Sequence, residues 1–224
     1  MRYALFLVVM LTGIANADQC MPTTVDHLVG TSCIMGSLKL TFTSEAISGI
    51  NAGNVLFTPD LSDSSAPSFT ISAADFSTHG LDIGILYFDI AELTPGDSVL
   101  AALGTTLVDP TVSSSSPDYT SLVSVFNCED SISTCARSSV YTNSPAKGFP
   151  SDKENVYLSW ATPNFTAGWF VSAATTDGYA SMQSATYTFY VVPTPEPSSA
   201  AVMALGLIAI VGKERVSRFV SKRN

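Results

Sequence analysis

Hydrophobic and polar residues alternate along much of the chain between residues 18 and 192. Leu38, Leu40 and Phe42 are separated by single polar residues, and the run 180–192 shows the same alternation near the end of this region. A period of two is typical of a β-strand with one buried face. No long stretch shows the period of 3.6 that marks an amphipathic helix. The pattern therefore predicts a domain built mainly from strands.

Ten runs have this alternation or a high content of β-branched and aromatic residues. They are residues 37–43, 54–58, 68–72, 81–90, 98–108, 119–128, 137–142, 156–160, 168–174 and 180–192. Residues typical of turns (Gly, Pro, Asn, Asp and Ser) separate most of the runs. About ten short strands at such spacing predict one all-β domain over residues 18–192, an antiparallel β-sandwich. A short helix is predicted near residues 73–76.

The first 17 residues have the three parts of a secretory signal peptide. A positive charge is followed by an apolar stretch over residues 4–14, and Ala15 and Ala17 form a small-x-small cleavage site. The apolar stretch is too short for an ordinary membrane span, which needs about 20 residues. The sequence predicts a signal helix that is removed on export, so that the mature chain begins at Asp18.

The last 32 residues follow a second targeting pattern. Residues 193–199 are rich in proline, which disfavours helix and ladder pairing and predicts an extended linker. Residues 200–212 are uncharged and mostly apolar, and residues 213–224 are rich in lysine and arginine. Cations that follow a short apolar helix resist translocation and hold the chain in the membrane. We therefore expect a separate membrane helix and a basic cytoplasmic tail.

The Pro195-Glu196-Pro197 triplet, followed by the apolar segment 200–212 and the basic tail 213–224, resembles the PEP-CTERM sorting signal of Gram-negative bacteria. The resemblance implies that an exosortase recognises the triplet and processes the chain at the inner membrane, where the helix is a transient anchor. It also implies an exported protein of the cell surface or extracellular matrix, often associated with exopolysaccharide in a biofilm.

Net charge excludes one broad class of partner. Residues 18–192 contain 17 acidic and four basic residues, which gives this domain a net charge of −13. Nucleic-acid binding needs clustered lysine and arginine, so no nucleic-acid partner is expected. Such a domain also repels anionic polymers unless cations lie between them.

The four cysteines are Cys20, Cys33, Cys128 and Cys135, and they allow three disulfide connectivities. Export favours disulfides, and proximity in the sequence favours Cys20–Cys33 and Cys128–Cys135. A zinc site is the alternative, but CxxC spacing and nearby histidine pairs are missing. The segment from Cys33 to Phe42 also resembles the early part of some PEP-CTERM cargo domains, which implies an extracellular β-domain without a catalytic motif.

Motifs of common catalytic sites are missing from the sequence. It contains no GxSxG, HExxH, GxxxxGK[ST] or GxGxxG, so no catalytic residue, cofactor or metal is assigned. His79 has Asp75 and Asp82 near it in sequence, and a lone loop histidine is the preferred interpretation. Three pairs of acidic residues are interpreted as solvated loops, with Ca²⁺ binding left open. They are Asp60/Asp63, Glu129/Asp130 and Asp152/Glu154.

Trp160, Phe165 and Trp169 form an aromatic group close together in sequence. Buried rings of this kind pack a core, whereas exposed rings can stack on sugars. The leading hypothesis is a non-enzymatic exported protein of the surface or matrix. The alternative is a carbohydrate-binding module that uses these three rings to contact exopolysaccharide. A hydrolase of envelope polymers is a third hypothesis.

Overall fold

The computed structural model describes residues 18–74, 76–93, 98–113, 121–129, 134–141, 153–157, 164–173 and 178–193. These residues form fifteen strands and two short 3-10 helices. The strands are β1 (Thr23–Thr24), β2 (Ser32–Met35), β3 (Leu38–Ser48), β4 (Leu56–Asp60), β5 (Ser68–Ser72), β6 (Ser77–Thr78), β7 (Leu81–Glu92), β8 (Ser98–Val108), β9 (Thr111–Ser113), β10 (Leu122–Glu129), β11 (Thr134–Tyr141), β12 (Lys153–Tyr157), β13 (Asn164–Ser172), β14 (Tyr179–Ser181) and β15 (Ser184–Pro193). The helices are η1 (Val25–His27) and η2 (Ala52–Asn54).

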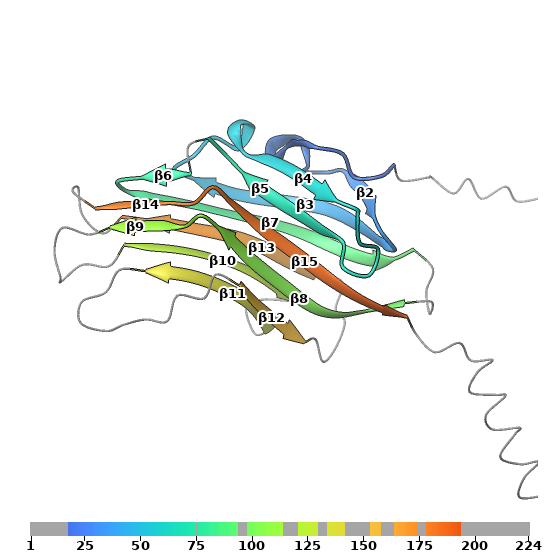
Figure 1. The fold of residues 1–224 in the computed structure, drawn as a ribbon. Helices are drawn as coiled ribbons and strands as arrows, with labels where there is room; N and C mark the ends of the chain where they lie inside the picture. The colour runs from blue at the N-terminus through green and yellow to red at the C-terminus, as the bar shows by residue number, and fades with distance from the viewer. Residues whose placement is uncertain are drawn as a thin grey trace, which may run out of the picture.

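Two six-stranded antiparallel sheets make up most of the described fold (Figure 1). Sheet I has the strand order β11-β10-β13-β7-β3-β2, and sheet II has the order β1-β4-β5-β15-β8-β12. A small three-stranded sheet, β6-β14-β9, lies at one end of the long strands (Figure 1). All strand pairs in these sheets are antiparallel.

The inner faces of sheets I and II pack on each other through aromatic rings. Phe42 and Phe88 of sheet I contact Phe57, Phe69 and Phe189 of sheet II, with ring centroids 5.5–6.0 Å apart across the interface. All five side chains are at most 1% exposed. Apolar burial on this scale is the main term that stabilises such a fold, because each ring removes a large apolar area from water. The predicted all-β, antiparallel architecture is confirmed for the described residues.

One buried hydrogen bond joins the two sheets across this core. The hydroxyl of Tyr187, on β15 of sheet II, donates to the carbonyl oxygen of Gly168, on β13 of sheet I, at 2.9 Å. Tyr187 is fully buried, and burial raises the pKa of its hydroxyl. The hydroxyl therefore stays protonated and can act as the donor.

Each of the ten predicted runs overlaps a strand, and several short strands have no predicted counterpart. These are β1, β2, β6 and β9, and one predicted run covers both β14 and β15. Strands of two to four residues are too short to show a period. The helix predicted near residues 73–76 is wrong, since the described residues there are not helical. Phe76 is 1% exposed instead, with its ring 5.5 Å from that of Trp169.

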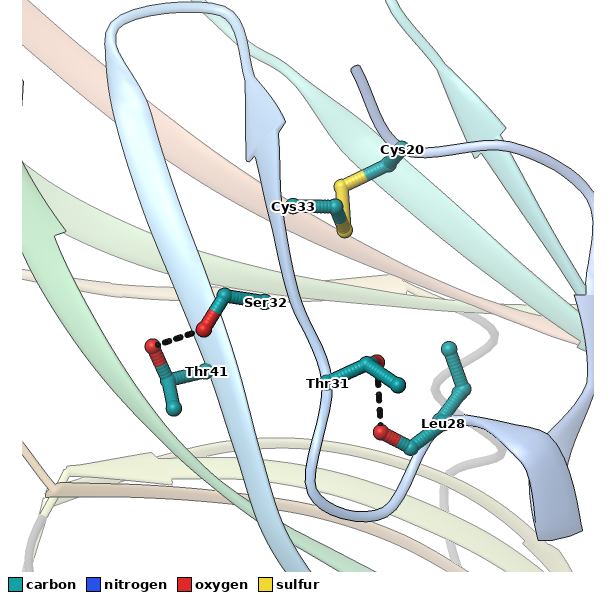
Figure 2. The surroundings of a disulfide bond; sticks show 6 residues. All are labelled: Cys20, Leu28, Thr31, Ser32, Cys33 and Thr41. Carbon is teal, nitrogen blue, oxygen red and sulfur yellow. Dashed lines mark hydrogen bonds between the residues drawn. A yellow bond between two sulfur atoms is a disulfide. The ribbon is translucent and has the colours of Figure 1, made fainter. Parts of the chain in front are cut away.

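The first disulfide fixes the N-terminal segment to the edge of sheet I. Cys20 is bonded to Cys33 of β2 (Figure 2). The backbone amide of Cys20 donates to the carbonyl oxygen of Ile34, and the amide of Ile34 donates to the carbonyl oxygen of Asp18, at 2.9 Å each. Gln19 and Ile34 also form a parallel bridge. These contacts cover the outer edge of β2, which would otherwise present unpaired backbone groups.

The second disulfide joins Cys128 of β10 to Cys135 of β11, which are directly opposite in the register of these two strands. Both predicted pairings are therefore confirmed, and the zinc alternative is wrong because all four sulfur atoms are bonded in pairs.

The targeting segments predicted at residues 1–17 and 194–224 lie outside the described residues. Within the part of the chain that the structure describes, no helix is long and apolar enough to cross a membrane. The last described strand ends at Pro193, close to the predicted domain boundary at residue 192.

Candidate functional site

The aromatic group proposed for sugar stacking is not on the surface. Trp169 is 0% exposed and Phe165 is 2% exposed. Trp169 packs against Phe76, and Phe165 stacks on Phe88 with centroids 6.1 Å apart. The glycan-contact hypothesis is therefore wrong for Phe165 and Trp169, and their core interpretation is confirmed. Trp160 lies outside the described residues.

The register of β13 against β7 explains why Trp169 can be buried. Trp169 is opposite Gly84, and a Cβ atom at Gly84 would lie only 1.9 Å from Cζ2 of the indole. The missing side chain thus leaves the space that the indole occupies. Glycine in a strand is often a mark of such a close approach.

A hollow of about 340 Å³ lies on sheet I, over strands β3, β7 and β13. Its volume is near the lower end of the ~300–1,000 Å³ typical of small-molecule sites. Phe88 and Phe165 are buried, so the solvent-facing part of the lining is formed by Tyr87 and by polar residues. The described lining residues are Thr43, Ser44, Tyr87, Phe88, Asp89, Asn164, Phe165 and Thr166.

A β-bulge in β3 shapes one side of the hollow. Phe42 is opposite Phe88 and Ser44 is opposite Tyr87, so Thr43 is an extra residue that has no opposite residue of β7 in the strand register. The Thr43 hydroxyl donates to the carbonyl oxygen of Tyr87 at 3.1 Å. Bulges bend a strand and re-aim side chains, and they are frequent beside functional sites.

Strand register brings the polar groups of the hollow together from three distant segments. Ser44, Tyr87 and Thr166 are opposite one another on three neighbouring strands. Two residues further along β7, on the same face of the sheet, Asp89 is opposite Asn164. Neighbouring strands are about 4.8 Å apart, so each set of opposite residues places its side chains within reach of one small ligand.

These side chains offer one aromatic ring together with donors and acceptors of hydrogen bonds. Tyr87 is 39% exposed, so part of its ring is open to solvent. The Asp89 carboxylate accepts hydrogen bonds, and the Asn164 amide can both donate and accept. In the described part of the chain, the side chains of Asp89 and Asn164 have no hydrogen bond and no ion pair. The arrangement suits a small polyhydroxylated ligand with an apolar face.

The histidine that the sequence placed between two acids, His79, has a hydrogen bond to the backbone in the described part of the chain. Nδ1 of His79 is 2.6 Å from the carbonyl oxygen of Gly178, so Nδ1 donates its proton to that oxygen. Asp82 is 6% exposed, and burial raises its pKa. Asp75 lies outside the described residues. A lone histidine with a backbone partner agrees with the preferred interpretation.

The first acidic pair stabilises turns. Asp60 accepts a hydrogen bond from the Ser62 amide and Asp63 from the Ser65 amide, both at 2.9 Å. Hydrogen bonds from the side chain and backbone of these serines lower the pKa of both carboxyls. No group of three metal-ligating side chains occurs among the described residues. Asp130 and Asp152 lie outside them.

The packed pair of antiparallel sheets defines an all-β protein with a sandwich architecture. No family model and no curated protein matches this chain. One solved structure that is similar is described as "Structural basis for the promiscuous specificity of the carbohydrate-binding modules from the beta-sandwich super family". The sequences are 9% identical, the TM-score is 0.23, and the match covers 80% of this chain and 64% of that one. A similarity this weak assigns no function to this chain.

Proposed function

We propose that this is an exported, non-enzymatic protein of the cell surface or matrix whose sandwich binds carbohydrate in the hollow on sheet I. The observation that supports the proposal is the partly exposed ring of Tyr87 beside Asp89 and Asn164 in a hollow of suitable size. The site replaces the one suggested by sequence, because it uses Tyr87 rather than Trp169.

Sugar chemistry fits these groups. A pyranose ring has an apolar face of C–H groups that can lie on an aromatic ring, and its hydroxyls both donate and accept hydrogen bonds. Ligand sites generally combine such an apolar contact with a few polar groups that fix orientation. Tyr87 supplies the first element, and Asp89, Asn164 and Thr166 supply the second.

Binding is favoured over hydrolysis by the number of carboxyl groups. Most glycoside hydrolases need two carboxyl groups that flank the scissile bond. Asp89 is the one carboxylate among the described residues that line the hollow. A single carboxylate is sufficient for recognition.

Export is supported by the two disulfides, which persist in oxidising compartments. We further propose that an exosortase sorts the chain through Pro195, Glu196 and Pro197 after transient anchoring in the bacterial inner membrane. Cell fractionation of a bacterial host tests this part. Protein without residues 1–17 is expected in the envelope, with C-terminal processing impaired by Glu196→Ala, and accumulation of full-length protein in the cytoplasm would contradict the proposal.

A polysaccharide pull-down with the purified full-length chain tests the site. Tyr87→Ala should weaken binding about tenfold, which corresponds to about 1.4 kcal/mol and is of the size expected for an aromatic contact. Leu81→Ala is the matched control, because Leu81 is also exposed on β7 but does not line the hollow. Equal binding by both variants would exclude this site.

Deletion of Thr43 gives a second test that keeps Tyr87 in place. Without the extra residue, Phe42 and Ser44 become neighbours, and β3 can pair regularly with β7 while the same residues face the core. The deletion variant should fold but bind carbohydrate more weakly, because the bulge that shapes the hollow is lost. A folded deletion variant with unchanged affinity would show that the bulge has no part in binding.

A further inference from the structure

The hollow on sheet I has an unbalanced charge. Asp89 is the one acidic side chain among its described lining residues, and no basic side chain lies among them. The remaining solvent-facing groups are a phenol, an amide and three hydroxyls. A ligand that enters therefore meets a negative charge and neutral polar groups.

One cation stands near the hollow on the same face of sheet I. Lys39 of β3 is opposite Ala91, and Asp89 is opposite Thr41, so Lys39 is a diagonal neighbour of Asp89. Lys39 does not line the hollow, and Asp89 has no ion pair in the described part of the chain. Glu45 lies on the core side of β3 opposite Leu86, and burial, followed by the nearby Asp26, raises its pKa. The domain over residues 18–192 adds a net charge of −13. A net charge of this sign and size repels anions that approach the domain.

We propose that the hollow selects an uncharged sugar residue and rejects uronates and sulfated sugars, with Asp89 as the residue that determines this specificity. The inference rests on the proposed function and narrows it to neutral polysaccharides. The Asp89 carboxylate accepts hydrogen bonds from two sugar hydroxyls, and a hydrogen bond to an ionised acceptor is stronger than one between neutral groups. A carboxylate or sulfate on the ligand would instead stand beside a like charge, with no cation among the described lining residues to offset it.

Binding to a neutral polysaccharide and to its carboxymethylated derivative tests this specificity with one polymer backbone. The purified full-length chain should bind the neutral polymer at least about tenfold more tightly, a difference of about 1.4 kcal/mol. The ratio of the affinity for the neutral polymer to that for the carboxymethylated polymer should shrink at about 1 M salt, because the Debye length falls to about 3 Å and the repulsion between charges is screened. Several neutral backbones, each with its derivative, should be measured.

Asp89→Asn keeps the shape of the side chain and removes its charge, so the ratio of the two affinities should fall to less than about threefold. Asp109→Asn is the matched control. It removes the same charge at an exposed turn between β8 and β9, where the φ of 48° is tolerated by asparagine. This control should leave the ratio unchanged.

The outcomes separate the inference from the proposed function. If the carboxymethylated polymer binds as tightly as the neutral one and Tyr87→Ala weakens both, the site is real and the inference is wrong. The inference also fails if Asp89→Asn leaves the ratio unchanged. If no polymer of either kind binds, the proposed function fails and the inference fails with it.

Discussion

Gly84 of β7 lies beneath the indole of Trp169, and replacing it by alanine tests how tightly this part of the core is packed. A Cβ atom there would lie 1.9 Å from Cζ2 and 2.2 Å from both Cε2 and Cη2 of the indole. Carbon atoms in good contact are about 3.5–4.0 Å apart, so the ring would have to move by about 1.6–2.1 Å. Trp169 is 0% exposed and packs on Phe76, so it has no open side toward which to move.

The expected cost of Gly84→Ala is about 3 kcal/mol in the free energy of unfolding. Overpacking of a core typically costs about 1–3 kcal/mol, and this overlap is with a rigid, enclosed ring. Complete removal of a buried tryptophan side chain costs about 3–5 kcal/mol, which sets a reasonable upper bound. Without the clash, Gly→Ala would stabilise the protein by about 0.4–1 kcal/mol, because alanine reduces the conformational entropy of the unfolded chain. The sign of the change in unfolding free energy therefore distinguishes a clash from its absence.

Urea denaturation followed by far-ultraviolet circular dichroism measures this cost without relying on tryptophan fluorescence. The midpoint of Gly84→Ala should fall by about 1–3 M, given slopes of about 1–3 kcal/mol per molar for small domains. Gly80→Ala is the matched control, since a Cβ atom there would be 3.5 Å from Thr78 Oγ1, an ordinary contact.

A second substitution distinguishes the clash from a general effect on the strand. Trp169→Leu shortens the opposing side chain, so Gly84→Ala should cost at least about 1 kcal/mol less in this background than in the wild type. If Gly84→Ala unfolds within about 0.5 kcal/mol of the wild type, or if the two costs simply add, the packing argument is refuted.

Three further changes should alter stability in known directions. Asp82→Asn should stabilise the protein at neutral pH, because burial raises the pKa of Asp82 and the wild type therefore loses stability as pH rises above the ordinary pKa of 3.8. Denaturation at pH 3 and pH 7 should show a difference in unfolding free energy between variant and wild type only at pH 7. Tyr187→Phe should lower the free energy of unfolding by about 1–1.5 kcal/mol, because it removes the buried hydrogen bond to Gly168. A decrease in the free energy of unfolding of less than about 0.3 kcal/mol would argue against that bond. Replacing Cys20 and Cys33 by serine should cost about 3 kcal/mol in the free energy of unfolding, because the disulfide closes a loop with a sequence separation of 13. Under reducing conditions, which also break Cys128–Cys135 in both proteins, the variant and the wild type should have the same midpoint, and a lower midpoint for the variant would show that the serines themselves destabilise the fold.

The sequence alone was sufficient to identify the strand-rich fold and both disulfides. Alternation at Leu38, Leu40 and Phe42 required one face of that strand to be buried, and the structure buries all three. The disulfides followed from short sequence separations, 13 and 7 residues, which keep each pair of cysteines close whatever the rest of the chain does. Both kinds of information are local, and local patterns can be read without knowing which strands are neighbours.

The β-bulge in β3 depends on pairing with β7, but it is also visible as a pattern in the sequence of β3 itself. Leu38, Leu40 and Phe42 occupy even positions, whereas Ile47 packs against the core from an odd position. Such a change of phase within one strand indicates an extra residue, which the structure places at Thr43. The bulge, and with it one side of the hollow, was therefore within reach of sequence analysis.

Only the tertiary structure decided how Trp169 fits into the core and which groups meet in the hollow. In its strand, Phe165, Ala167, Trp169 and Val171 share one face and only Phe170 is apolar on the other, so the alternation already favoured a buried Trp169. The space for the indole, however, depends on Gly84, a residue far away in the chain. In the same way, Asp89 and Asn164 become neighbours through the pairing of β7 with β13. Strand pairing over such distances is fixed by the packing of the whole core, because a shift of one residue would move every buried side chain of the strand to the solvent face.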